Sequence, residues 1–299
     1  MLFFKALSLL PTGVLYLISD CFYLIAYYLI GYRKRVVREN LAYAFPEKTK
    51  VQRKAIEKIF FRNLTDSFVE TIKLLTLSES EIDKRYKLVN PELVTDRVRQ
   101  GEVIIGVQAH FFNWEGHVVA MNRQLNKACE TVYLKVSNPV FELLMRSIRS
   151  RFGGSLVERN SFIKHLIANR NTPRMIGLAA DQRPQFSESR YWATFMNREA
   201  PFFEGAEKMA KKFSSPVIYG EIEKTKRGHY RYTYHLLASP PYKDTAPHSI
   251  TDAYIAAVEA NIRKNPSIYL WSHNRWKEKK STGNSTFEPE PDKSGLRTG

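Results

Sequence analysis

The residues best suited to chemistry lie at 108–117, QAHFFNWEGH, directly after the apolar run VIIGV at 103–107. Such a run predicts a buried parallel strand, and sites in parallel sheets form at the carboxyl ends of strands. His110 is placed to act as a general base, and Glu115, one helical turn further on, could hold and polarise its imidazole. Because the segment has no Ser or Cys, it favours direct attack by a substrate hydroxyl without an acyl-enzyme.

Spacing alone leaves other interpretations open. His110 could be a hydrogen-bonded loop residue, and Glu115 an ordinary carboxylate in the first turn of a helix. A zinc site is disfavoured because His110 and His117 are seven residues apart, without the HExxH pattern. Cys21 and Cys129 lack a partner at metal or redox spacing, so we interpret both as buried or lipid-facing thiols.

The elements that must position this segment alternate along the chain. Thr49 and Gln52 form a capping box before a long amphipathic helix, and Ser78 with Glu81 repeats the pattern before a short one. Alternating strands and helices predict an α/β fold with a mixed, largely parallel sheet flanked by helices. The expected strands cover 103–107, 131–136, 155–158, 175–180, 216–219 and 229–237, and the expected helices 49–75, 90–101, 114 onward, 138–151, 161–170, 204–213 and 251–264.

The N-terminal region predicts attachment to a membrane. Residues 13–32 are apolar apart from Asp20, and a helix of this length spans about 30 Å, the thickness of the hydrocarbon core. The basic cluster of Arg33, Lys34 and Arg35 is typical of a cytoplasmic end. A cleaved signal peptide is disfavoured because the sequence lacks a strongly basic N-terminal region and the apolar run is followed by a poor cleavage site. Spanning the membrane and lying in its interface both remain open.

Composition adds a strongly basic balance to this picture. The 299 residues include 46 Lys and Arg against 30 Asp and Glu, a net charge of +16. Such a surface attracts polyanions, whether nucleic acid, anionic headgroups or an acidic carrier protein. We expect a membrane helix at 1–32, one catalytic domain at 33–280, and a disordered tail at 281–299, where apolar periodicity is absent.

Four ordered blocks resemble one protein family. They are RVVRENLAYAFPEKT at 35–49, AHFFNWE at 109–115, AADQRP at 179–184 and NPSIYLWSHNRWK at 265–277. In these blocks the chain resembles the bacterial lipid A biosynthesis (lauroyl/myristoyl) acyltransferases, within the glycerolipid/lysophospholipid acyltransferase superfamily. The resemblance covers roughly residues 1 to 280.

The resemblance implies an enzyme on the cytoplasmic face of the inner membrane. It would transfer a fatty acyl group from acyl carrier protein to a hydroxyl of a lipid A precursor or a related lipid, with no cofactor, metal or nucleic-acid partner. His110 would be the general base and Glu115 its partner. Other residues would contact substrate or shape its site: Asn113, Trp114, Arg159 (on an acceptor phosphate), Asp181 and Gln182 (shaping the acceptor site or supporting the dyad), and Glu204, which with Gly205 resembles an oxyanion-associated pair.

Departures from the family pattern limit what carries over. Ala109 stands where the family has Gly, and Phe111 and Phe112 follow His110, so acyl chain length cannot be inferred. One alternative is the same chemistry on an aminolipid or glycolipid acceptor. Another is a basic membrane-peripheral binding protein without catalysis, which explains the charge but not the placement of His110 and Glu115 between a strand and a helix.

Overall fold

A computed structural model describes residues 1–125, 128–184 and 190–278. At its centre is a mixed sheet with the order β1-β9-β8-β2-β5-β3-β4, in which β8 and β9 pair antiparallel and the other described pairs are parallel. The predicted α/β fold, with its largely parallel sheet, is confirmed. The strands of this sheet are β1 (Tyr86–Leu88), β2 (Val103–Gln108), β3 (Cys129–Tyr133), β4 (Ser155–Glu158), β5 (Arg174–Ala179), β8 (Val217–Lys226) and β9 (His229–Ala238).

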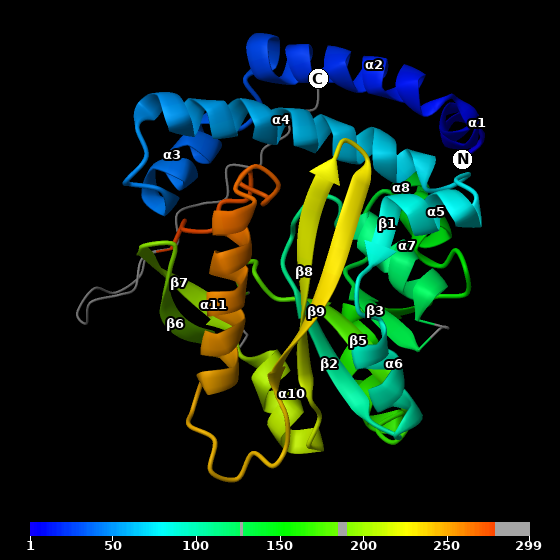
Figure 1. The fold of residues 1–299 in the computed structure, drawn as a ribbon, viewed down its shortest axis with the longest axis vertical. Coiled ribbons are helices and arrows are strands. Elements are labelled where there is room, and N and C mark those ends of the chain that lie inside the picture. Colours follow the sequence, from blue (N-terminus) through cyan, green and yellow to red (C-terminus); the bar gives the residue numbers. More distant parts are fainter. Residues whose placement is uncertain (126–127, 185–189, 279–299) are drawn as a thin grey trace.

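Helices surround this sheet, and two long ones lie across one end of it. Figure 1 shows α2 running alongside α4 above the hairpin of β8 and β9, with α11 on one flank. The helices are α1 (Leu2–Leu9), α2 (Thr12–Leu24), the π-helical η1 (Ile25–Ile30), α3 (Lys34–Ala44), α4 (Lys50–Lys73), α5 (Glu79–Arg85), α6 (Glu92–Arg99), α7 (Trp114–Gln124), α8 (Pro139–Arg149), the 3-10 turn η2 (Arg159–Ser161), α9 (Phe162–Ala168), α10 (Gly205–Phe213) and α11 (Ser249–Lys264).

The pairing of β2 with β5 brings distant residues together. The two strands run parallel in register, with Val103 opposite Arg174 and Gln108 opposite Ala179. The four inner residues of β2 are buried, as expected for a central parallel strand, and β5 is buried over its first three residues. Because the register is maintained to the last pair, the residues two positions beyond each strand, His110 and Asp181, leave the sheet side by side.

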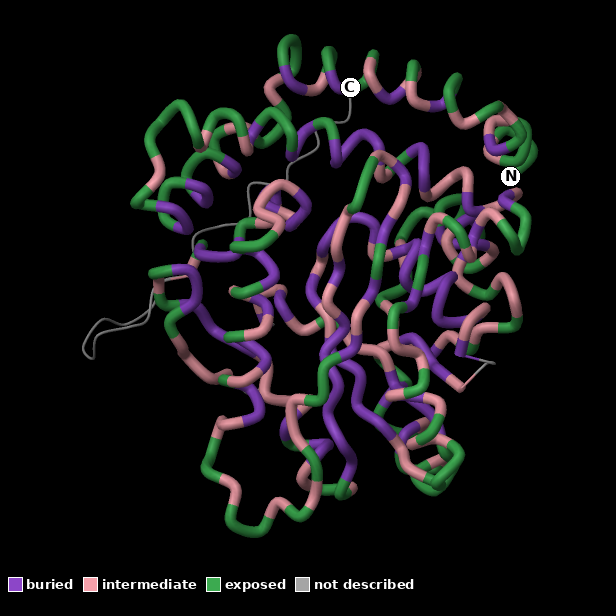
Figure 2. Tube along the Cα trace, in the orientation of Figure 1, coloured by how far each residue is buried: buried purple, intermediate pink, exposed green. Residues whose placement is uncertain are grey.

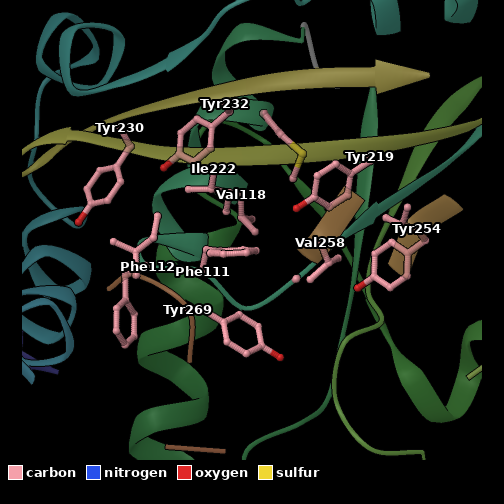
Figure 3. Close-up of a cluster of buried hydrophobic side chains, with 14 of the residues drawn as sticks. Phe111, Phe112, Val118, Tyr219, Ile222, Tyr230, Tyr232, Tyr254, Val258 and Tyr269 are labelled. Carbon is pink, nitrogen blue, oxygen red and sulfur yellow. The ribbon is translucent and has the colours of Figure 1, made fainter. Parts of the chain in front are cut away.

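An aromatic cluster immobilises the loop after β2. Phe111 and Phe112 are fully buried, and Figure 3 shows them among tyrosines of β8, β9 and α11. The Phe111 ring contacts Tyr269 at 5.3 Å between centroids, and Phe112 contacts Phe60 of α4 at 5.7 Å. Close-packed rings leave little room for the loop to move, so the backbone from which the His110 side chain projects is held in place.

Several elements differ from the sequence prediction. β6 (Arg190–Phe195) and β7 (Arg198–Phe203) form a hairpin that was not predicted, and α1, α3 and β1 were also missed. β8 is longer than the predicted 216–219, and β3 begins and ends earlier than 131–136. The predicted apolar helix at 13–32 is observed as α2 with η1, Thr12–Ile30. The proposed tail at 281–299 lies outside the described residues.

Candidate active site

His110 and Asp181 form the tightest polar contact at the carboxyl ends of the central strands. His110 Nδ1 lies 2.6 Å from Asp181 Oδ1, and the backbone N–H of His110 donates to the same oxygen at 3.1 Å. The Asp181 side chain is 3% exposed, whereas that of His110 is 21% exposed. The Nδ1 edge of the imidazole is therefore held by a buried carboxylate, while the ring still reaches solvent.

Charge around this pair favours a protonated imidazole. Burial lowers the pKa of His110. The charge and hydrogen bond of the Asp181 carboxylate raise this pKa, and the charge of Glu115 adds to them. Together they outweigh burial, so the net pKa is raised. Burial raises the pKa of Asp181, and the charge and hydrogen bonds of His110 outweigh it, with help from Arg275, so this pKa is lowered. Both shifts favour the ion pair of imidazolium and carboxylate that forms when His110 takes up a proton.

Glu115 has different partners from the one expected for it. Its carboxylate accepts two hydrogen bonds from Arg149 of α8, at 2.8 and 2.6 Å, and one from Trp114 Nε1 at 2.8 Å. Among the described residues no hydrogen bond joins Glu115 to His110; the group at Nδ1 is Asp181. Glu115 therefore acts on the imidazole through its charge, from a position fixed by a two-pronged guanidinium contact.

Trp114 and Asn113 occupy the start of α7. The Trp114 ring meets the His110 ring edge-on at 5.3 Å, so it forms a wall beside the imidazole. Asn113 is buried and caps the helix: its Oδ1 accepts from Gly116 N at 3.0 Å, while its Nδ2 donates to Glu70 at 3.3 Å. Both ends of the Asn113 amide are engaged within the protein, and a direct contact with substrate stays a prediction.

The segment after α11 contacts the loop that follows β2. Leu270 N donates to the carbonyl of His110 at 3.0 Å, and Phe112 N donates to Ile268 O at 2.8 Å. Asn40 of α3 in turn donates to the carbonyls of Trp271 and His273. Residues 265–277, one of the four family blocks, are therefore part of the framework around His110.

The remaining predicted residues are more dispersed. Arg159 begins η2 directly after β4, at the carboxyl end of that strand. β4 is three strands from β2 in the sheet, so at the usual strand spacing the two strands are roughly 14 Å apart. Gln182 follows Asp181 directly and is half-buried. Glu204 precedes α10 and pairs with Lys208 and with His248 Nδ1, at 3.4 and 2.9 Å. In the described part of the chain, no hydrogen bond or ion pair links Glu204 to the His110–Asp181 pair.

Two further contributors to the site carried no clear signal in the sequence. Arg149 ends α8. Nothing in the sequence distinguishes it from the many other arginines, and only the structure reveals its contact with Glu115. Tyr269 lies against Asp181, and burial and then the Asp181 charge raise its pKa.

The thiols and the second histidine are separate from this chemistry. Cys21 is exposed on α2, and Cys129 is buried, which raises its pKa to about 12. His117 is buried between Gln108 and Tyr234, and burial lowers its pKa to about 3. Within the described residues no three His, Cys, Asp or Glu side chains gather as a metal site would require.

Comparison with known proteins places this arrangement in a family. The sequence model described as bacterial lipid A biosynthesis acyltransferase matches residues 1–278. The lipid A biosynthesis myristoyltransferase of Escherichia coli (strain K12) is 27% identical over 128 residues, which are 43% of this chain and 39% of that protein. Lipid A biosynthesis acyltransferase 1 of Shigella flexneri gives the same values, so the aligned part spans about two-fifths of these two relatives. A lipid A biosynthesis acyltransferase of Haemophilus influenzae is 22% identical over 276 residues, 91% of this chain and 87% of that protein. This chain therefore belongs to the bacterial lipid A biosynthesis acyltransferase family.

Proposed function

We propose that this protein is an O-acyltransferase that transfers a fatty acyl chain from acyl carrier protein to a hydroxyl of a lipid A precursor. The observation that carries the proposal is the 2.6 Å contact between His110 Nδ1 and Asp181 Oδ1 at the ends of adjacent parallel strands, in a chain of this family. A histidine held in this way at Nδ1 has its other nitrogen, Nε2, available as a base. No hydrogen bond among the described residues occupies Nε2.

In the proposed reaction, Nε2 of His110 takes the proton of the acceptor hydroxyl. The oxygen attacks the thioester carbonyl, the C–S bond breaks, and the carrier thiolate leaves with the proton that His110 held. Asp181 stabilises the imidazolium between these two events. The N–H groups of Trp114 and Glu115, which the Asn113 cap does not use, are the candidate donors for the oxyanion. One well-placed donor of this kind contributes about 3 to 4 kcal/mol to transition-state stabilisation.

Glu115 remains part of the proposed catalytic group, with a sharpened role. Its charge raises the pKa of His110 through space, and Arg149 holds the carboxylate in place. In this proposal Asp181 is the hydrogen-bonded partner of the imidazole, and Glu115 is a second carboxylate beside its reacting face. This division explains how one histidine can serve first as a base and then as an acid.

The proposed setting is the cytoplasmic face of the inner membrane. One apolar helix, Thr12–Ile30, is long enough to contact a bilayer, and basic residues follow it. A net charge of +16 favours docking of an acidic carrier protein and of anionic lipid over docking of a basic partner. We expect Arg159 to contact a phosphate of the acceptor, and we expect no role for nucleic acid.

The direct test is acyl transfer by the full-length protein in detergent, with acyl carrier protein as donor and a lipid A precursor as acceptor, followed by the mass of the product. His110→Ala should abolish the mass gain, whereas His235→Ala, a change at an exposed histidine of β9, should leave it unchanged. Normal transfer by His110→Ala would overturn the assignment. Transfer to an aminolipid or glycolipid but not to the lipid A precursor would retain the chemistry and replace the acceptor.

A further inference from the structure

The long apolar helix packs lengthwise on the catalytic domain. Leu15, Ser19, Tyr23 and Tyr27 repeat every four residues and are buried against α4. Figure 1 shows α2 lying parallel to the domain surface along α4, and Figure 2 shows buried positions alternating with exposed ones along it. The helix is therefore one-sided, with an inner face that belongs to the domain.

Polar contacts fix this inner face. Ser19 donates to Asp66 of α4 at 2.8 Å, and Tyr16 donates to Glu70 at 3.1 Å. Asp20, the only charge in the apolar run, pairs with Arg227 at the turn between β8 and β9, at 2.7 Å. A charge that interrupts an otherwise apolar helix is thus used to hold the helix against the sheet.

A charged cavity lies directly beneath the helix. It has a volume of about 500 Å³ between α2, α4 and the β8–β9 hairpin. Charged side chains from these elements line it: Asp20, Arg62, Asp66, Lys224 and Arg227. If α2 crossed the bilayer, this cavity and the exposed lysines of α4 would enter the hydrocarbon with it. Charged groups at that depth are rare because their desolvation is costly.

The outer face of the helix is the opposite in character. Leu17 is 66% exposed and Leu29 79% exposed, and neighbouring apolar residues share this face: Val14, Phe22, Leu24, Ile25 and Ile30. A stripe of this size is unusual on a protein that meets only water. The helix therefore turns an apolar stripe away from the domain while its inner face is covered by α4, which fits a helix that lies with its outer face in the membrane interface.

A second apolar patch lies where α1 meets α8. The ring of Phe4 in α1 contacts Phe141 at the start of α8, with 5.7 Å between centroids. Around them the exposed residues are apolar: Leu2, Phe3, Leu134, Val140 and Leu143. Lys5, Lys135 and Arg146 lie exposed next to these residues in the chain. Basic residues beside an apolar patch fit a bilayer of anionic lipid.

We propose that α2 with η1 lies in the plane of the membrane surface, and that α1 and the first turns of α8 insert beside it into anionic lipid. The apolar side chains would reach the boundary between headgroups and acyl chains. α8 would then join the membrane to the site, because its last residue, Arg149, holds Glu115. This membrane-facing surface is a proposal beyond the proposed function, and it does not depend on which residue performs the chemistry.

Sidedness separates this arrangement from a spanning helix. Single cysteines are placed at Lys5 and Arg35, on either side of Thr12–Ile30, in a Cys21→Ser background that leaves the buried Cys129. Intact spheroplasts receive a membrane-impermeant maleimide, and labelling is compared with lysed cells. Protection of both positions until lysis is expected. Labelling of only one position in intact cells means a spanning helix and overturns the proposal. Labelling of both in intact cells retains the in-plane helix and contradicts the proposed cytoplasmic face instead.

The second patch has its own test. Full-length protein is floated with vesicles of equal parts phosphatidylglycerol and phosphatidylethanolamine. Phe141→Asp should lower the partition coefficient about ten-fold or more, because one large apolar side chain no longer leaves water. The matched control is Leu236→Asp: Leu236 is also partly exposed but lies eight residues along β9 from the turn that touches α2, roughly 26 Å. Equal losses for both variants, or no loss for Phe141→Asp, would refute the patch. Neither assay measures acyl transfer, so the two proposals fail independently.

Discussion

A single oxygen of Asp181 fixes both the ring and the backbone of His110, accepting from the backbone N–H at 3.1 Å and lying 2.6 Å from Nδ1. These residues are 71 positions apart in the chain, and the parallel register of β2 and β5 delivers them to the same point. The carboxylate therefore favours the tautomer in which Nδ1 carries the proton, and no hydrogen bond among the described residues engages Nε2. Four consequences of this arrangement and its surroundings can be measured.

Asp181→Asn should lower kcat for acyl transfer by about 10²- to 10⁴-fold, the usual contribution of a positioned acid–base group. The amide keeps the shape but can donate to Nδ1, which would place the proton on Nε2 and remove the base. Steady-state kinetics with acyl carrier protein as donor give the value. Asp96→Asn, a change at an exposed carboxylate of α6, is the control and should leave kcat unchanged. A loss of less than about two-fold in Asp181→Asn would show that Asp181 does not set the tautomer.

The pH profile of kcat/KM should rise with pH to a plateau, with an inflection above the ordinary histidine pKa of about 6.5. The sign follows from the direction of the shift: the pKa of His110 is raised, so the imidazole remains protonated, and inactive as a base, to a higher pH. In Asp181→Asn the main remaining influence is burial, which lowers the pKa, so the inflection should move to lower pH. A profile that is flat through this region in the unmodified protein would contradict the role of His110 as base.

How much of this site the sequence could predict depends on the range of each interaction. The capping box of Thr49 and Gln52 is present as predicted, because both partners lie within one helical turn. The strand-to-helix placement of His110 also followed from local pattern. The partner at Nδ1 did not: Glu115 is close in sequence, but its carboxylate turns to Arg149, and only the strand register reveals Asp181.

The missed elements have similar physical causes. The hairpin of β6 and β7 turns at Met196 and Asn197, both with positive φ, where a glycine would have signalled the turn. Tertiary contacts also stabilise α3, which holds the C-terminal segment through Asn40. The partners of α3 lie more than 200 residues away, so no local window of sequence contains the information.

Arg149→Ala should lower the free energy of unfolding by about 3 kcal/mol, because it leaves the buried carboxylate of Glu115 without its charged partner. Urea titration of the full-length protein in detergent measures this. Arg35→Ala removes the guanidinium of an exposed i,i+4 pair with Glu39 and should produce no measurable change. If both variants unfold at the same urea concentration as the unmodified protein, the Arg149–Glu115 pair is not formed in solution.

Gly116→Ala tests how closely α7 is packed beneath the site. A Cβ at this position would meet two ring atoms of Tyr86 at 2.3 Å and the hydroxyl of Tyr232 at 3.0 Å. Both rings are buried, so neither can move into solvent, and Tyr232 would also lose its bond to the Asn113 carbonyl. Overpacking of this kind costs about 1 to 3 kcal/mol, which exceeds the gain in helix propensity.

The matched variant is Gly13→Ala in α2, where a Cβ meets no atom within 4 Å. The same substitution there should raise the free energy of unfolding by up to about 1 kcal/mol, since only helix propensity changes. Opposite signs for the two variants in a urea titration are the expected result. A stabilising Gly116→Ala would mean that α7 can move away from β1 and β9, and the fixed position of Glu115 at its first turn would then have to be abandoned.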